Sequence, residues 1–220
     1  MPHGHEQPVG GWVDDAVLGQ AAVWLAERDR DLGRLHVQHG DPPLWARQPG
    51  YATLLHIILE QQVSLSSARA AFERLRAASD GQVDPGALLT FSDERLRTFG
   101  FSRQKAAYAR ELARAVLDGS LDLPGLARLD DDAARTALVS QRGVGRWTAD
   151  IYLLMALRRA DVWPATDLAL LAAAHELLGL ERRPGTHEMD LLAEVWRPWR
   201  SVAARMLWQA YLVSRGRPLV

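Results

Sequence analysis

Cysteine is absent from the 220-residue sequence, lysine occurs once, and no long hydrophobic run is present. The absence of cysteine excludes disulfide bonds, thiol catalysis, iron–sulfur clusters and thiolate zinc sites. No apolar run approaches the roughly 18 residues that a membrane-spanning helix requires. The N-terminal stretch MPHGHEQPVG lacks the charged-then-apolar order of an export signal. We therefore expect a cytoplasmic protein that does not associate with membranes.

Histidine content and net charge do not point to a ligand. The seven histidines are scattered, and we interpret the close pair His3 and His5 as part of a frayed tail rather than a metal site. The formal net charge is −1, so overall electrostatics do not predict a nucleic-acid partner. The arginines are unevenly distributed, however. The sequence from Val195 onward has five arginines and no acidic residue.

Apolar residues recur at helical spacing almost throughout, and no segment shows sustained strand alternation. The pattern predicts helices over residues 14–35, 51–78 with a break near 63–67, 92–100, 101–119, 130–141, 147–160, 166–179 and 187–216 with a hinge at Pro198. We expect Trp24, Trp163 and Trp196 in the core, since tryptophans at helical spacing are usually buried. The sequence therefore predicts an all-α protein.

The stretch QRGVGRWTAD (141–150) places two glycines around one valine, directly before a strongly helical run. Gly143 and Gly145 allow positive φ and place no Cβ in the way. The turn and the N-terminus of the following helix then present backbone N–H groups and a partial positive charge, which together suit an anion. Thr148 could add its hydroxyl or its N–H group. Taken alone, the glycine pattern is equally compatible with a simple reversal of chain direction.

The segment LVSQRGVGRWTADIYLL looks like the helix–hairpin–helix element of DNA repair glycosylases, and four more blocks extend the likeness. These are ILEQQVSLSSARAAFERL, LRTFGFSRQKAAYARELARAV, DVWPATDLALLAAAHELLG and AEVWRPWRSVAARMLWQAYL. In order and spacing they resemble the 3-methyladenine DNA glycosylase II family, of the AlkA and yeast MAG type, over about residues 45–213.

This resemblance implies a two-lobed helix–hairpin–helix glycosylase fold without the extra β-rich N-terminal domain of the longer bacterial members. We expect one lobe from residues 1–44 and 161–220, and a middle lobe from residues 45–160 that carries the hairpin at about 130–158. The partner implied is double-stranded DNA with alkylated bases, and we expect a monomer.

Asp167 follows the hairpin by about twenty residues, in PATDLAL. From the residues alone it is a helix-start carboxylate, which stabilises a helix by roughly 0.3–1 kcal/mol through the dipole. The resemblance implies that it is also the catalytic residue. An ionised carboxylate would stabilise the positive charge that develops on deoxyribose as the bond to a purine breaks, and it could orient or deprotonate the attacking water.

The resemblance also bears on strand cleavage. Bifunctional relatives have a lysine at the start of the helix after the hairpin, and this sequence has Trp147 there. The only lysine, Lys105, lies in a different segment. We therefore expect a monofunctional glycosylase without lyase activity.

Base flipping requires a side chain that fills the vacated space and a pocket for the base. The resemblance places the wedge at Gln62, where better-known members have leucine. It places pocket positions at Trp147, Ile151, Leu168 and Trp208. Ile151 and Leu168 stand where relatives often have tyrosine, so we expect a less aromatic pocket. Gln62 could instead be a helix-end residue that makes local hydrogen bonds.

We expect DNA contacts from the hairpin amides and from Arg146, Arg200 and Arg205, although exposed arginines on helices are often only solvated. No cofactor is required by this chemistry. The resemblance also implies a possible Na⁺ or K⁺ ion at the hairpin, held by the backbone carbonyls of Val139, Gln141 and Val144.

Two alternatives stay open at this point. One is a non-catalytic DNA-binding module that uses the hairpin only for grip, and Asp167 argues against it. The other is a glycosylase for oxidised or mispaired bases. Trp147 in place of lysine argues against such an enzyme of the lyase type, but not against a monofunctional one.

Overall fold

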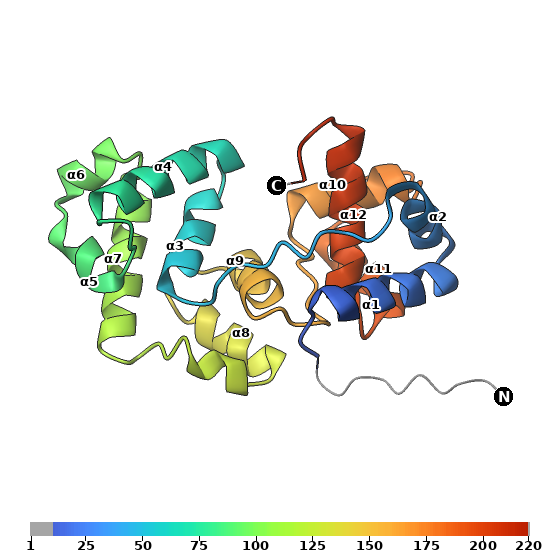
Figure 1. The fold of residues 1–220 in the computed structure, drawn as a ribbon, viewed down its shortest axis with the longest axis horizontal. Helices are drawn as coiled ribbons and strands as arrows, with labels where there is room; N and C mark the ends of the chain where they lie inside the picture. Colours follow the sequence, from blue (N-terminus) through green and yellow to red (C-terminus); the bar gives the residue numbers. More distant parts are fainter. Residues whose placement is uncertain (1–10, 220) are drawn as a thin grey trace. The chain divides into compact units, whose positions relative to one another are not determined.

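The computed structural model describes residues 11–219, and this part of the chain is helical (Figure 1). Its strand-like pairing is limited to one isolated bridge between Trp12 and Arg159. The predicted all-α class is therefore confirmed. Helices that could cross a membrane are not found among the described residues.

The chain forms two compact units, Met1–Trp45 with Arg158–Val220, and Ala46–Leu157. The division expected from the sequence was 1–44 with 161–220, and 45–160. Trp45 and Arg158, where the chain passes from one unit to the other, both have positive φ, 48° and 54°. Such values are uncommon for residues other than glycine and bend the backbone sharply.

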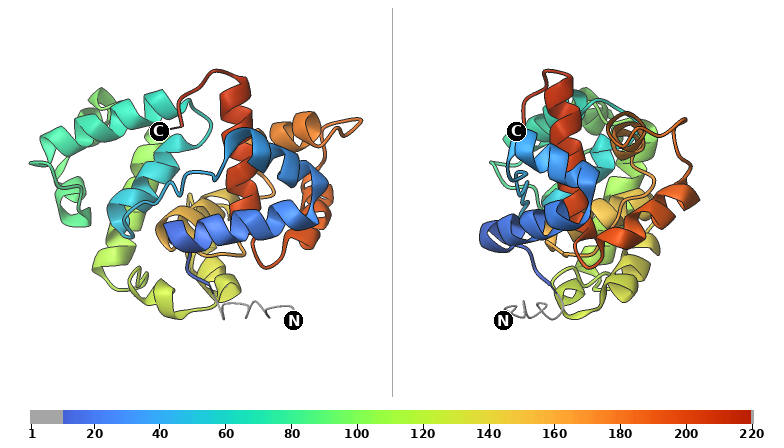
Figure 2. Two further views of the ribbon diagram at one scale, coloured as in Figure 1. Left: turned by 45° about the vertical axis from the view of Figure 1, so that its right-hand side comes forward. Right: turned by 90° about the vertical axis from the view of Figure 1, so that its right-hand side faces the viewer.

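The first unit is built around one long buried helix. Its elements are α1 (Asp15–Arg28), α2 (Arg30–His39), α10 (Leu168–Leu177), α11 (Thr186–Ala193), the 3₁₀ turn η3 (Glu194–Trp196) and α12 (Arg200–Ser214). Helix α12 packs against α1, α2 and α10, as the two views of Figure 2 show. All residues from Ser201 to Ala210 are buried, because α12 is covered on nearly every side.

The prediction of a single helix over residues 14–35 is wrong. Asp29 adopts extended backbone, which ends α1, and its carboxylate accepts hydrogen bonds from the amides of Asp31 and Leu32 at 2.9 Å each. Asp29 therefore caps a new helix, as aspartate at an N-cap commonly does.

The three tryptophans expected in the core divide into two groups. Trp163 and Trp196 are buried and pack edge to face, with ring centroids 5.3 Å apart. Trp24 is only half-buried, and the guanidinium of Arg28 lies 4.1 Å from its ring centroid. The expectation that Trp24 is a core residue is thus wrong, because its ring is partly exposed and is stacked on by the Arg28 guanidinium.

The second unit contains the remaining helices. They are α3 (Tyr51–Glu60), α4 (Leu65–Ala78), α5 (Pro85–Thr90), α6 (Asp93–Thr98), α7 (Arg103–Leu117), the 3₁₀ turn η1 (Gly125–Arg128), α8 (Asp131–Val139), α9 (Arg146–Ile151) and the π-helical turn η2 (Tyr152–Ala156). Helix α3 packs against α4, α7 and α9. Ser64, Ser92 and Ser102 begin α4, α6 and α7 with side-chain caps.

Candidate nucleic-acid interface and active site

The turn between α8 and α9 is tight, and its own conformation and packing require glycine at position 143. The amide of Val144 donates to the carbonyl of Gln141 at 3.0 Å, and Gly143 has φ of 86°. A Cβ on Gly143 would lie 2.3 Å from Cγ of Tyr108. Both the backbone conformation and the tyrosine ring therefore exclude a side chain at this position.

Gly145 has neither reason to lack a side chain. Its φ is −88°, which any residue adopts, and no described atom outside its immediate neighbours lies within 4 Å of where a Cβ would be. It is the exposed N-cap of α9. The missing Cβ leaves open space beside a helix N-terminus, where anions bind favourably.

Thr148 lies in the first turn of α9, but its side chain is buried. Its hydroxyl accepts a hydrogen bond of 2.8 Å from the side-chain amide of Gln61, which also donates to the carbonyl of Gly143 at 2.8 Å. The hydroxyl is therefore used as an acceptor inside the unit, which favours the backbone N–H over the hydroxyl as an anion ligand. The contribution of Thr148 to an anion site stays a prediction.

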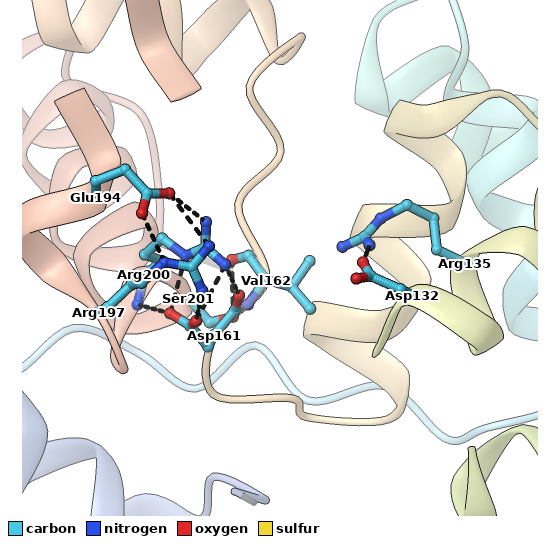
Figure 3. Close-up of polar contacts among 8 residues, drawn as sticks. All are labelled: Asp132, Arg135, Asp161, Val162, Glu194, Arg197, Arg200 and Ser201. Carbon is cyan, nitrogen blue, oxygen red and sulfur yellow. Dashed lines mark hydrogen bonds and ion pairs between the residues drawn. The ribbon is translucent and has the colours of Figure 1, made fainter. Parts of the chain in front are cut away.

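An ion pair joins the two helices of the hairpin. Asp150 of α9 is fully buried, and Nε of Arg135 on α8 donates to its carboxylate at 2.7 Å. Burial raises the pKa of Asp150, and the charges of Arg135 and Arg146 act against that shift. Figure 3 shows that Arg135 also reaches Asp132 on its own helix. The hairpin helices are thus held together by charge as well as by packing.

Of the three arginines expected to contact DNA, Arg146 is the accessible one. It is the first residue of α9, its side chain is 46% exposed, and its Nε lies 3.5 Å from Asp150. A cation at this place, beside the open space at Gly145, suits a phosphate.

Arg205 does not present a charge to the surface. The residue is 0% exposed, and its guanidinium donates to the carbonyls of Leu44 at 2.9 Å and Ser201 at 3.0 Å. Burial lowers the pKa of Arg205. This argues against the expected DNA contact, because a guanidinium without exposed surface offers no donor to a phosphate.

Arg200 is also occupied within its unit. Its guanidinium donates to the Asp161 carboxylate at 2.9 and 3.0 Å, and to the Asp161 carbonyl at 2.8 Å. Glu194 accepts a further bond, and Figure 3 shows this cluster together with Arg197. The side chain is only 15% exposed. A phosphate contact would have to replace these bonds, so the cluster favours a structural role for Arg200.

The turn between α3 and α4 carries the predicted wedge. Gln62 is exposed and has φ of 57°, a left-handed conformation that is uncommon for glutamine. Val63 and Leu65 beside it are exposed apolar side chains. The placement fits a side chain held outward, and the role of Gln62 as a wedge stays a prediction.

Lys105 was not expected to belong to this region. Its ammonium donates to the carbonyls of Leu59 at 2.6 Å and Gln61 at 2.9 Å, directly before Gln62. Burial lowers the pKa of Lys105. The signal in the sequence was only the uniqueness of this lysine, which gives no partner.

Asp167 is the N-cap of α10, and the sequence places it there correctly. Its Oδ1 accepts a hydrogen bond of 2.9 Å from the amide of Leu170 and one of 3.1 Å from the indole N–H of Trp208. Asp167 is half-buried, and the adjacent Leu168 is 73% exposed. The carboxylate is therefore held in place by two hydrogen bonds, on a residue that keeps part of its surface exposed.

Trp208 connects this carboxylate to a second aromatic ring. It is buried on α12 and packs edge to face with Trp45, with ring centroids 6.3 Å apart. The contact of Trp45 with Trp208 was not predictable, because Trp45 stands in a Gly/Pro-rich loop far from Trp208 in sequence. The other pocket positions, half-buried Trp147 and buried Ile151, belong to the second unit and stay predictions.

The expected cation ligands are ordinary backbone carbonyls of the hairpin. That of Gln141 accepts the Val144 amide and, like any carbonyl, has a second lone pair. Clusters of three or more metal-binding side chains are not found in residues 11–219. His3 and His5 lie outside the described residues.

A family model described as "HhH-GPD superfamily base excision DNA repair protein" matches residues 55–198, which is more than half of the chain. The chain belongs to the HhH-GPD superfamily. The matched range contains the wedge turn, the hairpin and Asp167, so the resemblance stated from the sequence is confirmed.

Two relatives are named for the same activity. DNA-3-methyladenine glycosylase 1 of Schizosaccharomyces pombe is 30% identical over 162 residues, which are 72% of this chain and 71% of that protein. The putative DNA-3-methyladenine glycosylase YfjP of Bacillus subtilis is 28% identical over 186 residues, which are 81% of this chain. The chain spans 65% of the length of YfjP.

A comparison with solved structures gives the same family. The S. pombe 3-methyladenine DNA glycosylase Mag1 in complex with abasic DNA has a TM-score of 0.81 and 28% identity. The match covers 86% of this chain and 95% of that chain. The helix–hairpin–helix glycosylase fold is therefore established for this HhH-GPD protein.

Proposed function

We propose that this HhH-GPD protein is a monofunctional DNA glycosylase that removes alkylated purines of the 3-methyladenine type from double-stranded DNA. The reaction is hydrolysis. The bond between the cationic base and C1′ of deoxyribose breaks, the base leaves as a neutral molecule with the bonding electrons, water supplies hydroxyl to C1′ and releases its proton to solvent, and an abasic site remains in an intact strand.

The observation that carries this proposal is the environment of Asp167. Hydrogen bonds from the Leu170 amide at the start of α10 and from the Trp208 indole N–H fix the orientation of this carboxylate, whose negative charge the reaction needs. Such a charge stabilises the oxocarbenium-like transition state and can orient the attacking water. An alkylated base is already cationic and leaves readily, so one carboxylate suffices.

The hairpin supports DNA binding through its backbone. Open space at Gly145, the N-terminus of α9 and the accessible Arg146 together suit one phosphate group. The S. pombe relative Mag1 forms a complex with abasic DNA. Neutral carbonyl oxygens of Val139, Gln141 and Val144 suit a monovalent cation, which would neutralise charge near that phosphate when bound.

The absence of lyase activity is part of the proposal. Trp147 stands where a Schiff-base lysine would be required, and it cannot form that bond. The amine of Lys105 is occupied by the carbonyls of Leu59 and Gln61. Borohydride treatment in the presence of abasic DNA should therefore leave no covalent adduct at a lysine side chain.

The test is release of base from methylated duplex DNA by Asp167→Asn protein. Asparagine caps a helix about as well as aspartate, so the fold should be kept while base release falls by at least about a hundredfold, in the range of lost electrostatic stabilisation. Binding to abasic DNA should persist. Asp14→Asn is the matched control, since Asp14 caps α1 in the same unit through the amide of Val17.

Two results would contradict the proposal. If wild-type protein binds DNA and releases no base from any lesion, the protein is a non-catalytic binding module. If it prefers 8-oxoguanine or a mispaired base to methylated purines in a panel of duplexes, the substrate class is a different one.

A further inference from the structure

We propose that Lys105 and Gln61 are positioning residues that brace the wedge turn, residues 61–64, against the hairpin and thereby favour the everted state of the target nucleotide. This inference rests on the proposed function for its consequence, but the brace itself is a matter of contacts within the second unit.

The first part of the brace is the ammonium of Lys105. Helix α3 ends at Glu60, and the last carbonyls of a helix have no intrahelical donor. Lys105, projecting from α7, donates to the carbonyls of Leu59 at 2.6 Å and Gln61 at 2.9 Å. The second of these belongs to the peptide unit that joins Gln61 to Gln62, so the ammonium fixes the plane from which the wedge residue starts.

The second part is the side chain of Gln61. Its amide nitrogen donates to the carbonyl of Gly143 and to the hydroxyl of Thr148, both at 2.8 Å. These acceptors lie on the hairpin turn and in the first turn of α9. Gln61 is thus bonded through its backbone to Lys105 and through its side chain to the hairpin.

The backbone conformation of Gln62 requires supporting contacts of this kind. Its φ of 57° is unfavourable for a side chain of this size and persists only where surrounding contacts enforce it. Lys105 supplies the contact immediately before Gln62. On the other side, Ser64 caps α4 by accepting the amide of Ser67. Without the ammonium, the turn would relax toward ordinary backbone and Gln62 would no longer be held outward.

A wedge acts on flipping and not on the chemical step. Its loss should therefore matter when the target base is stacked and paired, and matter little when the opposite position is already vacant. This difference separates positioning from general destabilisation, which would reduce activity on both substrates alike.

The experiment compares Lys105→Met with wild type on two methylated duplexes. In one the lesion is paired, and in the other it lies opposite an abasic site. We expect base release under single-turnover conditions to fall about tenfold or more on the first and less than about threefold on the second, given a flipping cost of a few kcal/mol. Lys105→Arg should restore most activity, because guanidinium can donate to both carbonyls.

Two further variants define the brace. Gln61→Met should show the same substrate difference, and the double variant should be no worse than either, as expected for residues that act as a unit. Arg103→Met removes an exposed charge from the same turn of α7 and should leave the ratio of the two substrates at the wild-type value.

Amide hydrogen exchange tests the brace without reference to activity. In Lys105→Met protein, exchange at residues 59–65 should be faster than in wild type, with the faster exchange extending to the hairpin at 141–148. Unchanged exchange, or equal loss of activity on both duplexes, overturns the inference. If wild type releases no base from either duplex, the proposed function fails while the exchange result still decides whether the brace exists.

Discussion

The two hairpin glycines lack a side chain for different physical reasons. Gly143 has positive φ and lies under the ring of Tyr108, so the fold itself requires it. Gly145 has ordinary φ and open space beside it, so nothing in the described residues requires it. A position that the fold leaves unexplained is a candidate for a ligand that needs to approach the backbone closely.

Alanine substitutions at these two positions should therefore separate stability from binding. Gly143→Ala should lower the free energy of unfolding by about 1–3 kcal/mol, since it adds both strain and a clash. Gly145→Ala should cost less than about 1 kcal/mol, because alanine is a poorer N-cap than glycine, and it should weaken binding to abasic duplex DNA. Thermal unfolding and fluorescence anisotropy measure the two effects. A Gly145→Ala protein that binds as tightly as wild type would contradict a close backbone contact at the hairpin.

Residue types alone predicted the position of Asp167 but not its partners. The apolar run after PATD located a helix start, and a carboxylate at that place is a common cap. Its contact with Trp208 joins residues 41 positions apart, which no local pattern reveals. The surroundings of Arg205 were not predictable for the same reason. A basic stretch indicates charge, whereas only the fold shows that this guanidinium is enclosed.

At the scale of helices, the hairpin depends on a buried charge. Asp150 is desolvated, and Arg135 reaches it from α8 with a side chain that is itself 24% exposed. Removal of Arg135 leaves the buried Asp150 carboxylate compensated by the half-exposed Arg146, whose Nε lies 3.5 Å away. The packing of α8 on α9 therefore depends on this arginine more than on any ion pair at the surface.

Arg135→Met should destabilise the protein by at most about 3–5 kcal/mol, the cost of breaking a buried ion pair, because Arg146 also faces Asp150. Arg142→Met is the comparison, because Arg142 pairs with Glu111 at 2.8 Å but its side chain is 71% exposed. That substitution should cost about 0–1 kcal/mol. Urea denaturation followed by circular dichroism measures both values. Equal costs would show that Asp150 does not depend on Arg135.

Helix boundaries were predictable where the sequence has a capping residue at the end of the helix. Ser102 and Gly119 mark the ends of α7, and Gly179 follows α10 with φ of 66°. The break at Asp29 was missed because apolar spacing continues across it. The π-helical turn after α9 was missed because a wider hydrogen-bonding pattern leaves no trace in apolar spacing.

For the whole molecule, the net charge of −1 limits how DNA can be held. Arg200 and Arg205 are both engaged internally, which leaves backbone amides and Arg146 as the best-supported phosphate contacts. Contacts from neutral amides position a phosphate without releasing many counterions. We therefore expect the chain to rely less on bulk attraction than strongly basic DNA-binding proteins do.

Arg146→Met should reduce the slope of log binding constant against log salt concentration by about 1. Arg200→Met should leave that slope unchanged, because its charge is neutralised by Asp161 and Glu194. Titrations of duplex DNA between low and moderate salt measure the slopes. A reduced slope for Arg200→Met would assign it a phosphate contact after all.

Lys105 has a practical consequence for work on this protein. Because it is the only lysine, an amine-acylating reagent can modify a single side chain. That amine is engaged by two carbonyls, so the rate of labelling reports how often the turn beside it opens. Mass spectrometry of one peptide then follows the opening of the turn between α3 and α4, with no engineered probe.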